Sequence, residues 1–327
     1  MSNRVSADVS QLLTQLRGMA IISVILAHTS SMTSGSNSVD KFVSNAFDVF
    51  GIIGVPLFFV ISGYLYSAQI PFKLFFFKKI RKIILPWFLA GLTVYLVSAP
   101  FGIQSSALNF SDAVSFIFGI KSLFWYMPLQ CFFYLFFFFI SKKLYLNLFF
   151  MGINILMLSM RGDLFGLNPY LNPFNWIGFF SLGIVARQNS HKLLSALNFV
   201  SIHERLCIAL LFLVFISVYR VKSSSAYFGI DSLILELTAI VIFVYWLGKS
   251  DKNNLLIFLG TNSFFVFLYH MPVVGFINFF YAKYTLSFIL LKPVFVLILI
   301  TVSIIILNWV FKILRLDLYR EILGLRP

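Results

Sequence analysis

Charged residues are scarce in this sequence. Only 11% of its 327 residues are Asp, Glu, Lys or Arg, whereas 60% are hydrophobic and the mean hydropathy is +0.94. A soluble domain of this length needs far more polar residues to cover its surface, so the composition excludes one. Apolar runs of about 20 residues, the length that spans a bilayer, recur from end to end. The predicted fold class is an all-α polytopic membrane protein.

Cysteine is also nearly absent. The chain has two cysteines, Cys131 and Cys207, and each lies in a different apolar run. This placement favours packing residues over a disulfide. Because no CxxC pair or Cys/His spacing occurs, we expect neither a metal ion nor a tightly bound cofactor.

Acidic residues are fewer than basic ones, with 11 Asp and Glu against 25 Lys and Arg and a net charge of +14. A basic balance is typical of nucleic-acid binding, but the cytoplasmic loops of membrane proteins also retain Lys and Arg. If the chain crosses the membrane ten times, both termini lie on the same side of the membrane, and 18 of the 25 cations lie on that side. Topology therefore explains most of the charge. We expect no nucleic-acid partner, and both termini are predicted to be cytoplasmic.

Apolar runs separated by polar breaks predict about ten membrane helices, packed as one domain over residues 1–327 around an internal polar cavity. The breaks carry turn residues, as in "SSMTSGSNS" (30–38) and "KSDKNN" (249–254). No clear small-x-small cleavage site follows the opening segment, so we expect a retained first helix instead of a signal peptide. The predicted helices cover residues 12–30, 46–68, 83–101, 123–141, 144–160, 173–187, 205–220, 229–248, 255–280 and 290–311.

Two polar residues, Arg17 and His28, bracket the apolar part of the first predicted helix. Eleven steps of about 100° return to within roughly 20° of the starting direction, so both side chains share one face. They are separated along the axis by roughly 16 Å. Either residue alone fits a simpler role, as a snorkelling arginine or a histidine at the helix end. Two polar side chains on the same face of one helix favour a polar cavity inside the bundle.

A basic cluster, Lys78, Lys79, Arg81 and Lys82, is predicted to stand just before the third helix on the cytoplasmic side. The simplest explanation is the positive charge that cytoplasmic loops retain. The other is an anionic ligand, since clustered Arg and Lys side chains bind phosphate groups well.

Further polar residues interrupt later apolar runs. Ser62 lies near the end of the second helix, and Glu236 lies well inside the eighth, where a neutral or paired structural acid is the alternative to a functional one. The ninth helix contains Asn262, Ser263 and His270. Because Ser263 and His270 are seven residues apart, they share a face.

Five stretches, taken in order, resemble the acyltransferase type 3 family of integral-membrane enzymes. That family begins with an arginine and a histidine separated by ten residues, as Arg17 and His28 are here. Members of the family also carry a basic cluster before a later helix, usually with paired arginines. This chain has Lys78 and Arg81 at the comparable positions. The other four stretches that match are "GVPLFFVISGYL" (54–65), "KKIRKIILPW" (78–87), "LFWYMPLQ" (123–130) and "LGTNSFFVFLYHMP" (259–272).

The resemblance implies transfer of an acetyl group from cytoplasmic acetyl-CoA to a sugar hydroxyl of a surface polysaccharide or its lipid-linked precursor, in a bacterial inner membrane. His28 would be the catalytic residue, either as general base or as a transient carrier of the acetyl group. The phosphates of the donor would bind Arg17 and the basic cluster, Lys78, Lys79, Arg81 and Lys82. The acceptor or cavity residues would be Ser62, Trp125, Glu236, Asn262, Ser263 and His270.

A second hypothesis is a transporter or flippase for a lipid-linked sugar, in which the intramembrane ionisable residues form a proton relay. Pro272 would then belong to a broken helix. No repeat of two halves is visible in the sequence, and the cations of the basic cluster gather on one side. Both observations favour the enzyme.

Overall fold

The computed structural model of this protein describes residues 7–31, 38–67, 70–98, 109–120, 123–160, 168–189, 204, 208, 212, 228–284 and 288–325. All regular structure in these ranges is helical. Six helical segments are long and apolar enough to cross a membrane: α1 (Ala7–Thr29), α2 (Ser38–Tyr64), the rod Phe72–Val97, α11 (Ile230–Lys249), α13 (Ser263–Lys283) and the rod Ile289–Ile313, which contains α14 (Lys292–Ile313).

Three further apolar helices are shorter: α6 (Tyr126–Ile140), α7 (Leu144–Ser159) and α8 (Ile177–Gln188). The prediction of an all-helical membrane protein is confirmed, but the number of membrane-length helices among the described residues is six, not ten. The predicted helix at 205–220 and Cys207 lie outside the described residues. The remaining short elements are α5 (Phe110–Ile117), α12 (Asn254–Thr261), α15 (Asp317–Ile322) and the 3₁₀ turns Leu123–Trp125, Pro173–Asn175 and Ile289–Leu291.

The third predicted helix begins earlier than expected. α3 (Phe72–Lys79) continues through a π-helical segment, Ile80–Ile84, directly into α4 (Leu85–Ser98). The basic cluster therefore lies within a helix, and the prediction that it precedes the helix is wrong. The Leu85 N–H bonds the carbonyl of Ile80, five residues back. Pro86 has no N–H to donate, and its ring would crowd the carbonyl four residues earlier, so a widened turn at this point fits the sequence.

The ninth predicted helix is two helices. α12 ends at Thr261 and α13 begins at Ser263, with the non-helical Asn262 between them. The Asn262 side chain donates a hydrogen bond to the carbonyl of Phe258, so it satisfies part of the end of α12. Pro272 lies inside α13, which continues past it to Lys283.

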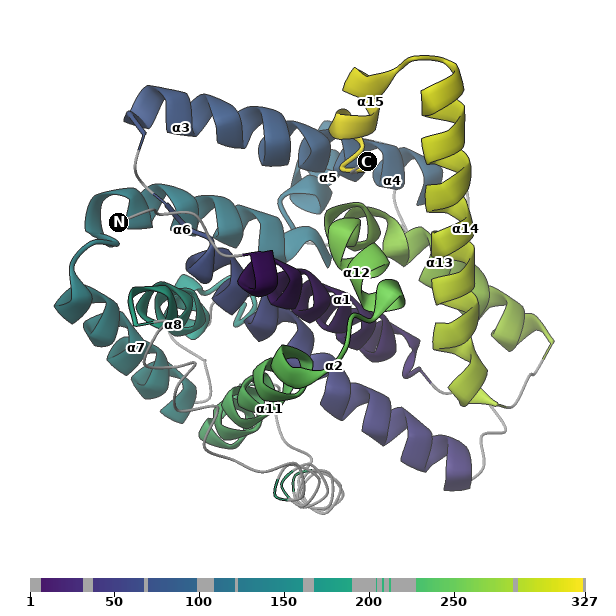
Figure 1. The fold of residues 1–327 in the computed structure, drawn as a ribbon. Helices are drawn as coiled ribbons and strands as arrows, with labels where there is room; N and C mark the ends of the chain where they lie inside the picture. Colours follow the sequence, from purple (N-terminus) through teal and green to yellow (C-terminus); the bar gives the residue numbers. More distant parts are fainter. Residues whose placement is uncertain are drawn as a thin grey trace.

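Helix α1 lies at the centre of the bundle and contacts α2, α11, α12, α13 and α14 (Figure 1). Glycines bring two of these neighbours close. A Cβ at Gly18 would collide with the backbone carbonyl of Leu256, and one at Gly260 with that of Thr14. On the α2 side, Gly51 and Gly54 face α1 in the same way. Small residues let membrane helices approach backbone to backbone, so these contacts fix α1 between α2 and α12.

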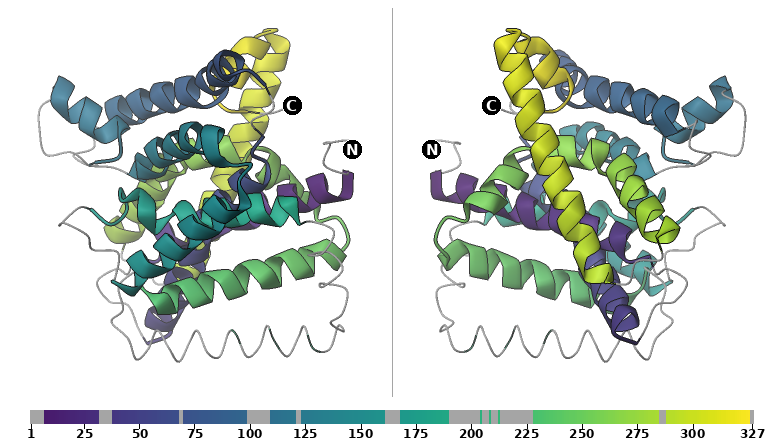
Figure 2. Two further views of the ribbon diagram at one scale, coloured as in Figure 1. Left: turned by 90° about the vertical axis from the view of Figure 1, so that its left-hand side faces the viewer. Right: turned by 90° about the vertical axis from the view of Figure 1, so that its right-hand side faces the viewer.

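The rod α3–α4 and helix α11 lie on opposite sides of α1 (Figure 2). Apolar side chains cover much of the outer surface. On α14, for example, Ile298, Ile306 and Trp309 are each about half exposed or more. An exposed apolar surface of this extent is unfavourable in water and suits a lipid environment. Because α1 is central, its polar side chains Gln15, Ser23 and Thr29 are buried against protein, and Arg17 and His28 are half-buried.

Candidate functional site

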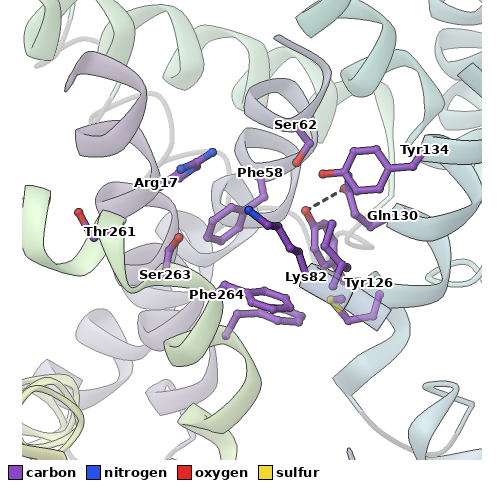
Figure 3. A pocket seen from close by; sticks show the side chains of 13 residues that line it. Arg17, Phe58, Ser62, Lys82, Tyr126, Gln130, Tyr134, Thr261, Ser263 and Phe264 are labelled. Carbon is purple, nitrogen blue, oxygen red and sulfur yellow. Dashed lines mark hydrogen bonds between the residues drawn. The ribbon is translucent and has the colours of Figure 1, made fainter. Parts of the chain in front are cut away.

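A pocket opens beside Arg17, where α1, α2, α6, the π-helical segment and the α12–α13 junction meet. Its cavity volume is about 130 Å³. Figure 3 shows the side chains of Arg17, Lys82, Ser62 and Ser263 directed into this space. The pocket thus collects four residues that the sequence had placed in three separate predicted helices and one predicted loop. Its lining comprises Arg17, Phe58, Ser62, Lys82, Ile83, Tyr126, Met127, Gln130, Tyr134, Thr261, Ser263, Phe264 and Phe267.

Two cations give the pocket its positive charge. Arg17 is half-buried on α1, and Lys82 lies on the exposed side of the π-helical segment. A third, Lys79, places its Nζ 3.4 Å from the centre of the Tyr134 ring, which also lines the pocket. This cation–π contact holds the Tyr134 ring and keeps the Lys79 charge near the pocket wall. The arrangement favours an anionic ligand.

Uncharged polar groups form the inner wall of the pocket. The Tyr126 hydroxyl donates to Gln130 Oε1 at 2.9 Å, and both residues are buried. Gln130 Nε2 has no hydrogen-bond partner among the described residues. A buried amide donor facing a pocket suits an acceptor oxygen of a ligand. Sequence reasoning missed both residues, although a Tyr and a Gln four residues apart in an apolar helix signal a paired polar face.

The other end of α1 holds a pair of histidines. The ring centroids of His28 on α1 and His270 on α13 lie 5.3 Å apart, with a tilt of 32° between the rings. His270 is almost completely buried, and His28 is half-buried. The two imidazoles come from opposite ends of the sequence, and the packing of α13 on α1 brings them together.

Aromatic side chains stand between the pocket and the histidine pair. The Phe267 ring lines the pocket, lies 5.1 Å from the Tyr126 ring and lies 6.1 Å from the His270 ring. His28 is not among the residues that line the pocket. A continuous polar cavity from Arg17 to His28, as the sequence predicted, is therefore not shown in this structure.

The remaining members of the basic cluster lie away from the pocket lining. Arg81 forms an ion pair with Glu321 of α15 at 3.2 Å, and both side chains are more than half exposed. Lys78 is exposed on α3. Of the four cations in the predicted cluster, only Lys82 lines the pocket.

Four residues predicted for the acceptor or the cavity lie outside the pocket lining: His270, described above, and three more. Trp125 is buried and stacks on Trp176, the residue just before α8, with ring centroids 5.0 Å apart. Glu236 is buried within α11. Asn262 is the junction residue between α12 and α13 described above, next to Ser263, which does line the pocket.

Comparison with models of protein families gives one match, to a family described as "Acyltransferase domain", over residues 12–313. The match covers nearly all of the chain and includes the pocket and the histidine pair. Comparisons with curated proteins and with solved structures gave no match.

Proposed function

The chain belongs to the acyltransferase type 3 family, and from this premise we propose that it is a membrane O-acetyltransferase. In this proposal it moves an acetyl group from cytoplasmic acetyl-CoA to a sugar hydroxyl of a surface polysaccharide or its lipid-linked precursor. The observation that carries the proposal is the spacing on α1, which joins a cationic pocket at Arg17 to a histidine pair at His28.

The pocket would anchor the donor. Its cavity volume of about 130 Å³ is close to that of a cavity of about 150 Å³ that binds benzene, so the pocket accommodates a compact group such as a phosphate. Arg17 supplies a planar guanidinium that can bind two phosphate oxygens together, and Lys82 supplies a point charge at the open side. The nucleotide part of the donor would stay outside, beside the exposed Lys78 and Arg81.

His28 would carry out the chemistry. The pantetheine arm of the donor is long and thin, and it would follow the stripe of roughly 16 Å from Arg17 to His28. Passage requires the Phe267 and Tyr126 side chains to move apart, because they separate the two ends. This requirement predicts that donor binding and opening of the aromatic pair are coupled.

Two reactions at His28 fit the geometry. As a general base, the imidazole takes the proton of the sugar hydroxyl while the oxygen attacks the thioester carbonyl; the thiolate then leaves and receives that proton. As a nucleophile, one ring nitrogen attacks the carbonyl first and releases the thiolate, which takes the proton of the other ring nitrogen. The sugar hydroxyl then attacks the acetyl-imidazole, the bond between the acetyl carbon and nitrogen breaks, and the hydroxyl proton passes to the released imidazole. A single-turnover experiment without acceptor distinguishes the two, since only the second releases CoA.

The acceptor that we propose is a sugar unit attached to a lipid, at the membrane of a bacterial cell, with both termini of the enzyme in the cytoplasm. The predicted outer loops are short, which leaves little surface for a long polymer. A lipid-linked sugar instead reaches the histidine pair from the bilayer or from the outer face.

The test is to incubate the purified protein with acetyl-labelled acetyl-CoA and lipid-linked or envelope glycans. Transfer of label to a glycan is expected. Mass spectrometry of glycans from a deletion strain would then identify the acceptor by the loss of single acetyl groups. If the glycans carry the same masses in both strains while a lipid-linked sugar accumulates on one side of the membrane, the protein is a flippase and the proposal is wrong.

A further inference from the structure

The His270 ring is held in one orientation by its own helix. Its Nδ1 lies 3.1 Å from the carbonyl oxygen of Val266 and 2.9 Å from that of Phe267. Carbonyl oxygens only accept hydrogen bonds, so Nδ1 must carry the proton and donate. Both carbonyls lie one turn back along α13, so the helix itself supplies the acceptors for the His270 ring N–H.

A proton on Nδ1 fixes the other nitrogen of the neutral ring as an acceptor. His270 Nε2 is buried and has no hydrogen-bond partner among the described residues. Leaving a buried polar atom without a partner destabilises the fold, so such atoms need an explanation. The lone pair on His270 Nε2 can therefore accept a hydrogen bond, and no described residue donates one.

The His28 ring can supply that donor. At a centroid separation of 5.3 Å, the edge nitrogens of two imidazoles can reach hydrogen-bond distance after a small rotation. Catalytic hydrogen bonds are often long in ligand-free structures and shorten when substrate binds. His28 is half-buried, and among the described residues its ring makes no bond to the backbone like those that hold His270, so it is the ring that would rotate.

We infer that His270 is a positioning residue for His28: its Nε2 accepts a hydrogen bond from one ring N–H of His28 and so directs the lone pair of the other nitrogen toward the reacting groups. The inference rests on the proposed function. It changes the predicted role of His270 from an acceptor-binding residue to one that acts through His28. When His28 takes the proton of the sugar hydroxyl, the imidazolium keeps its bond to Nε2, which stabilises the new positive charge.

The test compares two variants of the full-length protein in detergent. His270→Leu removes the acceptor, whereas His270→Gln keeps a side-chain oxygen that can accept from His28. Nitrogen-15 NMR of labelled histidines reports the tautomer of His28 directly, and a His28→Gln sample identifies its signal among the four histidines. Wild-type His28 is expected in one tautomer, His270→Leu in a mixture of two, and His270→Gln again mainly in one.

Kinetics provide the second readout. His270→Leu is expected to lower kcat on the order of tenfold to a hundredfold, as loss of an orienting partner does, with the KM for acetyl-CoA unchanged. His270→Gln should recover most of the loss. A His28 tautomer unchanged in His270→Leu would overturn the inference without touching the proposed function. If no glycan is acetylated by the wild type while the tautomer still shifts, the proposed function is wrong and the pairing stands.

Discussion

The two ends of α1 differ in what surrounds them. At Arg17 the helix borders an open pocket with a second cation, hydroxyl groups and a buried amide. Eleven residues later, His28 faces a single buried imidazole, and the aromatic pair of Phe267 and Tyr126 separates it from the pocket. The Arg17 end therefore has positive charge and an open cavity, whereas the His28 end has a proton acceptor in a confined space.

This difference indicates a division of labour along one helix. Cations in a partly open pocket bind phosphate without altering the reactivity of a distant thioester. A confined imidazole does little for binding but can move a proton or carry an acyl group. Substitutions at the two ends should therefore separate in kinetics, with changes in KM at one end and in kcat at the other.

His28→Ala should have the largest effect. Removing a general base or a nucleophile lowers kcat by about 10²- to 10⁴-fold, and the KM for acetyl-CoA should change little because the pocket is intact. The measurement is the initial rate of label transfer at several donor concentrations. Gel-filtration elution and circular dichroism equal to the wild type serve as the folding control. A correctly folded variant with wild-type kcat would remove His28 from catalysis.

Arg17→Ala should come next, with a tenfold or larger increase in the KM for acetyl-CoA, since hydrogen bonds to charged groups contribute about 1.5–3 kcal/mol. Arg17→Lys should recover only part of the affinity, because a point charge replaces the planar fork. Isothermal titration with CoA gives the same comparison without turnover. An unchanged CoA affinity in Arg17→Ala, or a loss confined to kcat, would break the division between the two ends.

The glycines around α1 allow each end to be moved separately. A methyl group at Gly260 would displace α1 near Arg17, and one at Gly51 would displace it at Ala27, next to His28. Each Gly→Ala change should destabilise the protein by about 1–3 kcal/mol through overpacking. Gly260→Ala should also raise the donor KM, and Gly51→Ala should lower kcat, both by less than the direct changes.

Gly152→Ala is the matched control for these two variants, because nothing lies within 4 Å of a Cβ placed at Gly152 on α7. It should leave both kinetic constants unchanged and raise the midpoint of denaturation slightly, because Ala favours a helix more than Gly does. If Gly260→Ala and Gly51→Ala altered the same kinetic constant, α1 would act as one unit and its two ends would not be independent.

Sequence reasoning reached the all-helical fold and the placement of Arg17 and His28 on one helix, because both depend on local periodicity. Grouping of Ser62, Ser263 and Lys82 at the pocket could not be predicted, since it depends on how α2, α13 and the π-helical segment cross α1. The third helix was predicted to start too late, because a cluster of four cations is typical of a loop at the membrane surface. In the structure the chain is helical through this cluster and past Pro86.

Gln130 and Tyr126 are pocket residues that the sequence analysis did not identify. Their polar atoms are visible in the sequence, but a Phe-rich helix directs attention to its apolar surface, and only the structure turns both side chains toward the pocket. The pairing of His28 with His270 likewise needed coordinates, since it joins residues that are 242 positions apart.

The smallest expected effect is at Glu321, which pairs with Arg81 at the edge of the basic cluster. Both side chains are more than half exposed, and exposed ion pairs contribute about 0.2–1 kcal/mol. Glu321→Gln should therefore release Arg81 for the donor and lower the KM for acetyl-CoA by about fivefold at most. Salt should erase this gain, because exposed charges are screened. The same substitution in an Arg81→Gln background should have no effect on KM. Arg81 lies next to the pocket residue Lys82 and is not near the histidines in the sequence, so kcat should stay constant in both backgrounds. A change in kcat would mean that charge beside Lys82 affects the histidine pair.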